Sequence, residues 1–298
     1  LGGWLTTDFS WRWAFGINVP LGIAIIVGVA LTVAESREPE RRGIDVVGAI
    51  LSVVTTGSLV FGLIEGRTLG WWRTATPLRI GGWTWPWDVS PIPVAFAIAV
   101  VGLAAFVGWG ILRLRRGRST LLAFGLFGLR SFRNGNIAAM VVSLGEFGII
   151  LSLPLWLQFV IGFDAFQTGL VLLALAVGSF VASGFAGAFS GRLDPVWVVR
   201  LGLVAEIVGV GAIGFVIGPD AAWGWLVPAL FVYGFGVGLA TAQLTGVVLS
   251  EVPVAESGQA SGTQSTSRQV GSALGIAILG TILFTTTAGG LGAKLDDR

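Results

Sequence analysis

Three ionisable residues lie inside long apolar stretches of this chain, where a charge is costly. Glu146, Glu206 and Arg268 each lie in a run of about 20 mainly apolar residues, the length of helix that crosses a bilayer. Ionisable side chains at that depth usually contact a partner or take part in function. The two carboxylates could carry protons. The guanidinium could only compensate a negative charge, because arginine does not lose its proton in proteins.

Glu146 is placed near the middle of its predicted span. It follows Asn136, the expected membrane entry, by about 10 residues, or about 15 Å at roughly 1.5 Å per helical residue. Asn136, Ser143 and Glu146 fall on one helical face. A carboxyl group that gains and loses a proton at this depth suits a proton-coupled pump. The alternative is a neutral carboxyl that makes one hydrogen bond between helices.

Arg268 belongs to a polar stripe at helical spacing. The stripe consists of Ser257, Ser261, Gln264, Ser265, Arg268 and Ser272. Such a stripe must face protein or water rather than lipid. Arg268 therefore needs a carboxylate, backbone carbonyls or a wet cavity, or else it is a packing arginine near the end of its helix. Glu146 and Glu206 could each be its partner, and the sequence does not choose between them.

The small residues beside Glu206 favour a packing role for this carboxyl group. Glu206 shares a helical face with Gly202 and Gly209, and small residues let helices approach closely in a membrane. We therefore expect a structural role for Glu206.

Gln243 adds polarity to the following span, together with Thr241 and Thr245. The same span holds the triplet Gly234-x-Gly236-x-Gly238, which superficially resembles a dinucleotide-binding fingerprint. No strand is predicted before it, so the fingerprint lacks its context and the glycines are interpreted as packing residues or a flexible point.

The elements that must position these residues are eight apolar stretches. The chain of 298 residues is 54% hydrophobic and 11% charged, with a mean hydropathy of +0.86. Backbone polar groups in lipid must be satisfied within their own segment, so the stretches are predicted helices. The fold class is therefore an all-α polytopic membrane protein with about eight complete spans, at residues 13–33, 45–64, 91–112, 134–160, 167–189, 196–217, 223–249 and 259–287.

Composition excludes several other functions. The chain has no cysteine and no histidine, which removes thiolate and imidazole catalysis and the usual zinc, haem and iron–sulfur ligands. We expect no cofactor, no metal and no enzymatic activity. A net charge of +2 gives no electrostatic support for nucleic-acid binding.

The arginines predict an orientation. Loops after the first, third, fifth and seventh spans carry 11 arginines, whereas the other loops and the tail carry 6 basic residues. The positive-inside rule places the arginine-rich loops in the cytoplasm. The tryptophan-rich loop at 67–90 then faces outward, and its rings suit an interfacial belt.

Several motifs resemble one family. The segment Trp11-Arg12-Trp13-Ala14-Phe15-Gly16-Ile17-Asn18-Val19-Pro20-Leu21-Gly22 resembles the entry to the sixth span of major facilitator transporters, in the fourteen-span drug:proton antiporter branch of the EmrB/QacA type. The stretch from Glu256 to Gly275 is similar to the penultimate span of that branch. Gly191, Arg192, Asp194 and Arg200 resemble a degenerate copy of the superfamily's cytoplasmic loop motif, with Pro195 where an arginine is common.

The resemblance implies a division of the chain. Residues 1–34 would end the N-terminal lobe, 35–133 would form the extra central helix pair with its loops, and 134–298 would form a C-terminal lobe without its last helix. We therefore expect a C-terminal fragment. Glu146 and Gln243 would line the central cavity, Glu206 would lie peripherally, and Arg268 with Gln264 would lie near the lobe interface.

The implied activity is proton-coupled export of amphipathic or cationic compounds, which is multidrug efflux by alternating access across a bacterial plasma membrane. Its partners would be protons, a small-molecule substrate and the lipid bilayer, with the oligomeric state left open. One alternative keeps the fold and exports an endogenous lipid, antibiotic or siderophore. Another is a structural membrane subunit that does not transport.

Overall fold

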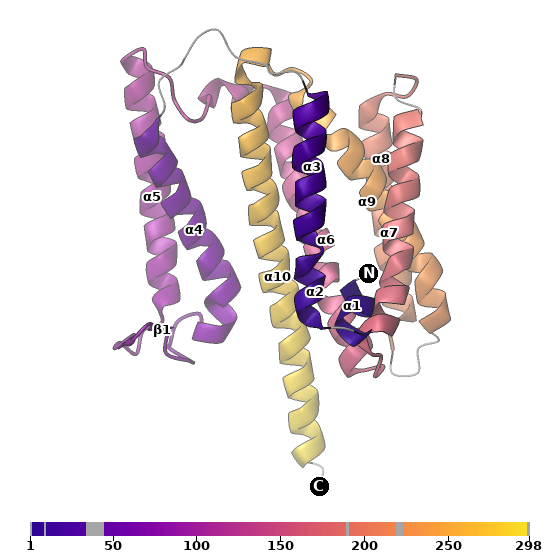
Figure 1. The fold of residues 1–298 in the computed structure, drawn as a ribbon. Coiled ribbons are helices and arrows are strands. Elements are labelled where there is room, and N and C mark those ends of the chain that lie inside the picture. The colour runs from indigo at the N-terminus through magenta and orange to yellow at the C-terminus, as the bar shows by residue number, and fades with distance from the viewer. Residues whose placement is uncertain (1, 9, 34–44, 189–190, 219–222, 297–298) are drawn as a thin grey trace. The chain divides into compact units, whose positions relative to one another are not determined.

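The chain folds almost entirely into helices, as predicted. A computed structural model describes residues 2–8, 10–33, 45–188, 191–218 and 223–296, and only the backbone of 2, 223 and 283–296 (Figure 1). The helices of the first half are α1 (Gly2–Asp8), α2 (Trp11–Gly16), α3 (Asn18–Thr32), α4 (Val46–Leu69), α5 (Pro91–Arg115) and the short 3-10 helix η1 (Phe124–Gly128). The predicted polar segment 35–42, with three of the orienting arginines, lies outside the described residues, as does Arg298.

The second half continues in the same way. It contains α6 (Arg130–Phe159), α7 (Ala165–Ala188), α8 (Pro195–Val216), η2 (Trp223–Trp225), α9 (Leu226–Leu249), η3 (Val254–Glu256) and α10 (Ser257–Asp296). Between α4 and α5, the tryptophan-rich loop forms a small antiparallel hairpin of β1 (Arg79–Ile80) and β2 (Trp83–Thr84). Trp85 packs edge-on against Trp83 and Trp87 in this hairpin.

Within the described part of the chain, 7 helices are long and apolar enough to cross a bilayer. They correspond to the first seven predicted spans, with α2 and α3 together forming the first. The eighth predicted span lies in α10, which is not among the 7. The N-terminal half of α10 carries the polar stripe, and the side chains of this helix are described only as far as Ile282. The class of polytopic helical membrane protein is confirmed.

The described chain packs as two compact units. The first comprises Leu1–Arg41 with Leu153–Gln243, and the second comprises Arg42–Ser152 with Leu244–Arg298. The borders fall inside α6 and α9. The three-part division expected from the family resemblance concerns a longer transporter and stays a prediction.

In the first unit, the glycine triplet of α9 is a packing device. A Cβ built at Gly234 or Gly238 would overlap the backbone of Leu175 or Ser179 on α7. A Cβ at Gly236, half a turn away, would overlap the backbone of α8 at Gly202 and Glu206. The alternate glycines thus seat α9 between α7 and α8, and this confirms the packing interpretation over the flexible point and the nucleotide fingerprint.

In the second unit, two glycines seat α10 against α6. A Cβ at Gly271 would overlap the carbonyl oxygen of Met140, and one at Gly275 would overlap that of Leu144. One helical turn further, Leu279 occupies the space above Gly148. Each step of four residues along α10 matches four along α6 in the same sense. The two helices therefore run parallel, as expected if both begin on the same side of the membrane.

We predict that Gly271→Ala weakens this contact. The added methyl group would force the helices apart, and overpacking of about 1–3 kcal/mol lowers the melting temperature of a protein of this size by roughly 3–8 °C. Thermal unfolding of the purified protein in detergent, followed by tryptophan fluorescence, measures the change.

Gly262→Ala, on the same helix, is the matched control. Nothing lies within 4 Å of a Cβ at Gly262. Alanine is also the better helix former, so this variant should melt at or above the wild-type temperature. Equal melting of the two variants would contradict the packing argument.

Candidate functional site

The contact between α6 and α10 brings Glu146 and Arg268 together. Nη2 of Arg268 lies 4.0 Å from Oε2 of Glu146, across the interface that Gly271 and Gly275 make narrow. Of the two carboxylates that the sequence left open as partners of Arg268, the structure selects Glu146. Glu206 belongs to the first unit.

The ion pair is loose. The side chain of Glu146 keeps 21% of its surface exposed and that of Arg268 keeps 39%. Oε2 of Glu146 is itself buried, and among the described residues no donor lies within hydrogen-bond distance of it. The carboxylate therefore has a cation nearby without a hydrogen bond that fixes it. Its negative charge can be compensated either by Arg268 or by a proton.

Two further buried oxygens of α6 lack partners. The amide nitrogen of Asn136 donates to the carbonyl of Phe132 at 2.8 Å, which leaves Oδ1 buried without a hydrogen bond among the described residues. Oγ of Ser143 is also buried without a hydrogen bond among the described residues. Buried polar atoms are normally hydrogen-bonded, because desolvating them without a partner is costly. The predicted polar face of α6 thus carries three unsatisfied oxygens, at Asn136, Ser143 and Glu146.

The stripe on α10 is joined to α9. Gln264 is buried, and its amide nitrogen donates to Oγ1 of Thr245 at 3.2 Å. Ser272, also buried, donates to the carbonyl of Arg268 at 2.9 Å. Gln264 and Ser272 lie one helical turn before and after Arg268. The Gln264 bond therefore joins α10 to α9 one turn before the guanidinium, whereas the Ser272 bond stays within α10.

Gln243 and Glu206 both lie in the first unit. Gln243 is half-buried on α9. Its grouping with Glu146 stays a prediction. Glu206 lies on α8 against Gly236 of α9, where a Cβ would come within 2.9 Å of its Cγ. Tyr233, fully buried, packs against Gly209 of α8 in the same interface. This is the close helix contact that the sequence predicted around Glu206.

The residues of the loop motif shape the start of α8. Gly191 has a φ of +84°, in the left-handed region that favours glycine. The carboxylate of Asp194 caps α8 by accepting from the backbone N–H of Val196 at 2.9 Å. Pro195 occupies the first turn, where a missing N–H costs nothing. Arg192 is exposed, and the guanidinium of Arg200 lies 5.2 Å from the ring centroid of Trp197.

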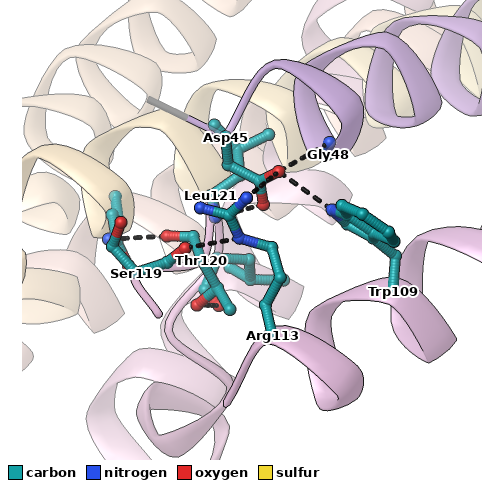
Figure 2. Close-up of polar contacts among 9 residues, drawn as sticks. Asp45, Gly48, Trp109, Arg113, Ser119, Thr120 and Leu121 are labelled. Atoms are coloured by element: carbon teal, nitrogen blue, oxygen red, sulfur yellow. Dashed lines mark hydrogen bonds and ion pairs between the residues drawn. The ribbon is translucent and has the colours of Figure 1, made fainter. Parts of the chain in front are cut away.

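A polar cluster centred on Asp45 was not singled out from the sequence. Asp45 caps α4 by accepting from the N–H of Gly48 at 2.9 Å, and it also accepts from the indole nitrogen of Trp109 on α5 at 2.9 Å (Figure 2). The N–H of Leu121 donates to the other carboxylate oxygen at 3.3 Å. Nη1 of Arg113 lies 3.6 Å from Oδ1.

The cluster ties the start of α4 to the end of α5. Arg113 also donates from Nε to the carbonyl of Ser119 at 2.8 Å, so the chain after α5 is held as well. Burial works against ionisation of Asp45, but the hydrogen bonds from Trp109, Gly48 and Leu121 and the charge of Arg113 outweigh it and hold the pKa of Asp45 below its ordinary value.

A signal for this cluster exists in the sequence. Asp45 directly precedes an apolar run, which is the position of a helix cap. Trp109 and Arg113 are four residues apart and therefore share a helical face. Nothing in the spacing links the two helices, so only the fold shows that the cap and the α5 face meet.

The sequence pattern of the Major Facilitator Superfamily matches residues 1–276. The chain belongs to the major facilitator superfamily. This membership, together with the apolar helices, makes it a multi-pass membrane protein of a transporter family.

Similar members of the superfamily are named for transport, multidrug resistance or export. The probable actinorhodin transporter of Streptomyces coelicolor is 33% identical over 293 residues, which are 97% of this chain and 47% of that protein. Multidrug resistance protein Stp of Mycobacterium tuberculosis is 29% identical over 283 residues, 95% of this chain and 49% of the relative. Multidrug export protein EmrB of Escherichia coli is 27% identical over 284 residues, which are 95% of this chain and 52% of that protein. The chain spans about half the length of these relatives.

Within this superfamily member, the Glu146–Arg268 pair can be tested by a double-mutant cycle. Removing one partner leaves a charge uncompensated, whereas removing both leaves none. We expect Glu146→Gln and Arg268→Gln each to lower the melting temperature, and the double variant to melt higher than the sum of the two losses predicts. Additive losses would show that the two side chains do not interact.

The Asp45 cluster predicts a pH dependence of stability. Because the folded pKa is depressed, the stabilisation is fully present above the ordinary value of 3.8 and is lost as the pH falls through the folded pKa. We expect Asp45→Asn to melt below wild type at neutral pH, and the difference to shrink under acid conditions below that value. Melting curves across this pH range measure it.

Asp8→Asn is the control for this series, because Asp8 is an exposed carboxylate on α1. The melting temperature of Asp8→Asn should equal that of the wild-type protein at every pH. A difference between Asp45→Asn and wild type that stays constant into acid would contradict the role of the ionised carboxylate.

Proposed function

We propose that this protein is a proton-coupled secondary transporter that exports amphipathic or cationic compounds across a bacterial plasma membrane. The observation that carries the proposal is the loose pair of Glu146 and Arg268 in the α6–α10 contact. A carboxylate that is partly buried, near a cation and without a hydrogen bond among the described residues can exchange a proton as its surroundings change.

The proton cycle follows from this geometry. A proton from the outer side forms an O–H bond at Oε2 of Glu146, and the carboxyl group becomes neutral. The attraction to Arg268 is then lost, and the guanidinium is free to form other contacts. Release of the proton to the cytoplasm restores the carboxylate and the pair. Alternating access would link these two states to the inward-open and outward-open forms of the transporter.

The other polar residues have supporting roles in this proposal. Gln243 and Gln264 would offer hydrogen bonds to substrate, and Arg268 would set how readily Glu146 takes a proton. Glu206 would stay structural in the α8–α9 interface. Gly191, Arg192, Asp194 and Arg200 would shape a cytoplasmic loop, and the arginine-rich loops would lie in the cytoplasm.

A second candidate is export of an antibiotic that the cell itself makes. Its support is the 33% identity to the probable actinorhodin transporter, and a cephamycin export protein of Amycolatopsis lactamdurans is 30% identical over 302 residues. The fold and the proton site would be the same, and only the cargo would differ. Efflux assays with a panel of lipophilic cations and neutral antibiotics would separate the two candidates.

Glu146→Gln should abolish uphill export. Expressed from its full reading frame and reconstituted in liposomes, the wild-type transporter should move substrate against its gradient when a pH gradient is imposed, whereas the variant should not. Substrate exchange without a pH gradient needs no proton step, so the variant should retain it. Radiolabelled substrate flux measures both activities.

Glu206→Gln is the matched control, because it makes the same change at the structural carboxyl. It should retain uphill export. Proton-driven export by Glu146→Gln at the wild-type rate would remove Glu146 from the coupling mechanism.

A further inference from the structure

A partly open cavity of about 490 Å³ lies in the second unit, away from the α6–α10 contact. Its walls come from α4, α5, the segment after α5 and the first turns of α10. Ser52, Thr55 and Thr56 line it on α4, and Gln259, Thr263 and Thr266 line it on α10. Leu103, Phe106, Leu121 and Leu122 supply the apolar walls. This size is within the range of small-molecule sites.

The cavity uses a second polar face of α10. Gly271 and Gly275 point to α6, whereas Gln259, Gly262 and Thr266 point to the cavity. At about 100° per residue these two sets lie on roughly opposite sides of the helix. The polar stripe that the sequence predicted lies toward α6. The cavity face is therefore separate from the side that carries Arg268.

Along α10, the cavity offers hydrogen-bond acceptors. The amide nitrogen of Gln259 donates to the carbonyl of Thr120 at 3.1 Å, which leaves its Oε1 buried and unpaired among the described residues. The hydroxyl of Thr263 donates to the carbonyl of Gln259 at 2.9 Å, and that of Thr266 donates to Gly262 at 3.0 Å. Each hydroxyl has used its proton, so its oxygen could serve a ligand only as an acceptor.

The Asp45 cluster fixes one wall of this cavity. Leu121 lines the cavity and donates its N–H to the Asp45 carboxylate. The carbonyl of the preceding Thr120 accepts from Gln259. The segment after α5 is thus held on one side by a charged cluster and on the other by α10, and this preorganises the wall.

We propose that this cavity is a second ligand site, which binds uncharged amphipathic compounds that carry a hydrogen-bond donor, such as a phenol or an alcohol. None of the residues that line it is ionisable, so it has nothing to compensate a charged ligand. The donor of the ligand would bond to the hydroxyl oxygen of Thr263 or Thr266, and its apolar body would lie against Leu103 and Phe106. The site goes beyond the proposed transport function and does not depend on it.

A matched pair of ligands tests the chemistry. Binding of tritiated 1-naphthol and of tritiated 1-methoxynaphthalene is measured on the purified protein, from its full reading frame, in lipid nanodiscs, with empty nanodiscs subtracted. The two compounds share the apolar ring, and only the naphthol donates a hydrogen bond. Thr263→Val keeps the shape and removes an acceptor, so it should weaken naphthol binding about three- to tenfold, the effect of one hydrogen bond. Binding of the ether should not change.

A matched pair of glycine variants tests the location. Gly262→Leu puts a side chain into the cavity, where a Cβ meets no atom within 4 Å, and should abolish naphthol binding. Gly108→Leu makes the same change at an exposed glycine of α5 with equally open surroundings and should leave binding unchanged. Melting temperatures confirm that both variants fold.

Three results would overturn the proposal. Equal binding of naphthol and its ether would exclude donor recognition. Equal binding by Gly262→Leu and Gly108→Leu would exclude this cavity. Loss of naphthol binding in Glu146→Gln would assign the ligand to the transport site instead. Wild-type naphthol binding in Glu146→Gln, whatever that variant does to export, supports two independent sites.

Discussion

The close approach of α10 to α6 is the contact on which the charged site depends. Gly271 and Gly275 let α10 lie against the carbonyls of Met140 and Leu144, and this brings the guanidinium of Arg268 within 4.0 Å of Glu146. Inside a bilayer, apolar side chains gain little by leaving lipid, so helix contacts rely on close packing and on polar pairs. In this protein the close packing and the polar pair depend on each other. The glycines make the pair possible, and the pair compensates a carboxylate that is partly buried.

The same physical rule organises the first unit without a charge pair. Gly234, Gly236 and Gly238 alternate between α7 and α8, and Glu206 lies where α8 meets Gly236. The outer surfaces of these helices are apolar, with Phe180 and Phe215 exposed by 82% and 95%. Lipid-facing side chains and interhelical glycines therefore divide each helix into two sides.

The helix α10 departs from this two-sided arrangement. It is polar toward α6, where Arg268 compensates a carboxylate, and polar toward α4, where Gln259 and the threonines border an uncharged cavity. The Asp45 cluster belongs to the same architecture, because it holds the segment that closes the cavity. A wholly apolar helix could not present polar groups toward both α6 and α4.

Much of the fold could be predicted from the residue pattern alone. Apolar runs of bilayer length locate most helices to within about five residues of their ends, because hydrocarbon forces each segment to satisfy its own backbone. The exception is α10, which continues to Asp296, beyond the predicted end at residue 287. The stripe around Arg268 and the shared face of Asn136, Ser143 and Glu146 follow from helical periodicity in the same way. For the glycine triplet the sequence left packing and a flexible point open.

The partners of these residues could not be predicted, because spacing along one helix shows which side chains share a face but not which helix that face meets. Only the tertiary structure selects Glu146 over Glu206 as the partner of Arg268, joins Asp45 to Trp109 and Arg113 across two helices, and turns Gln259 toward a cavity. Periodicity is a property of one segment. Charge compensation and cavities are properties of two or more segments, and the packing of the folded chain decides them.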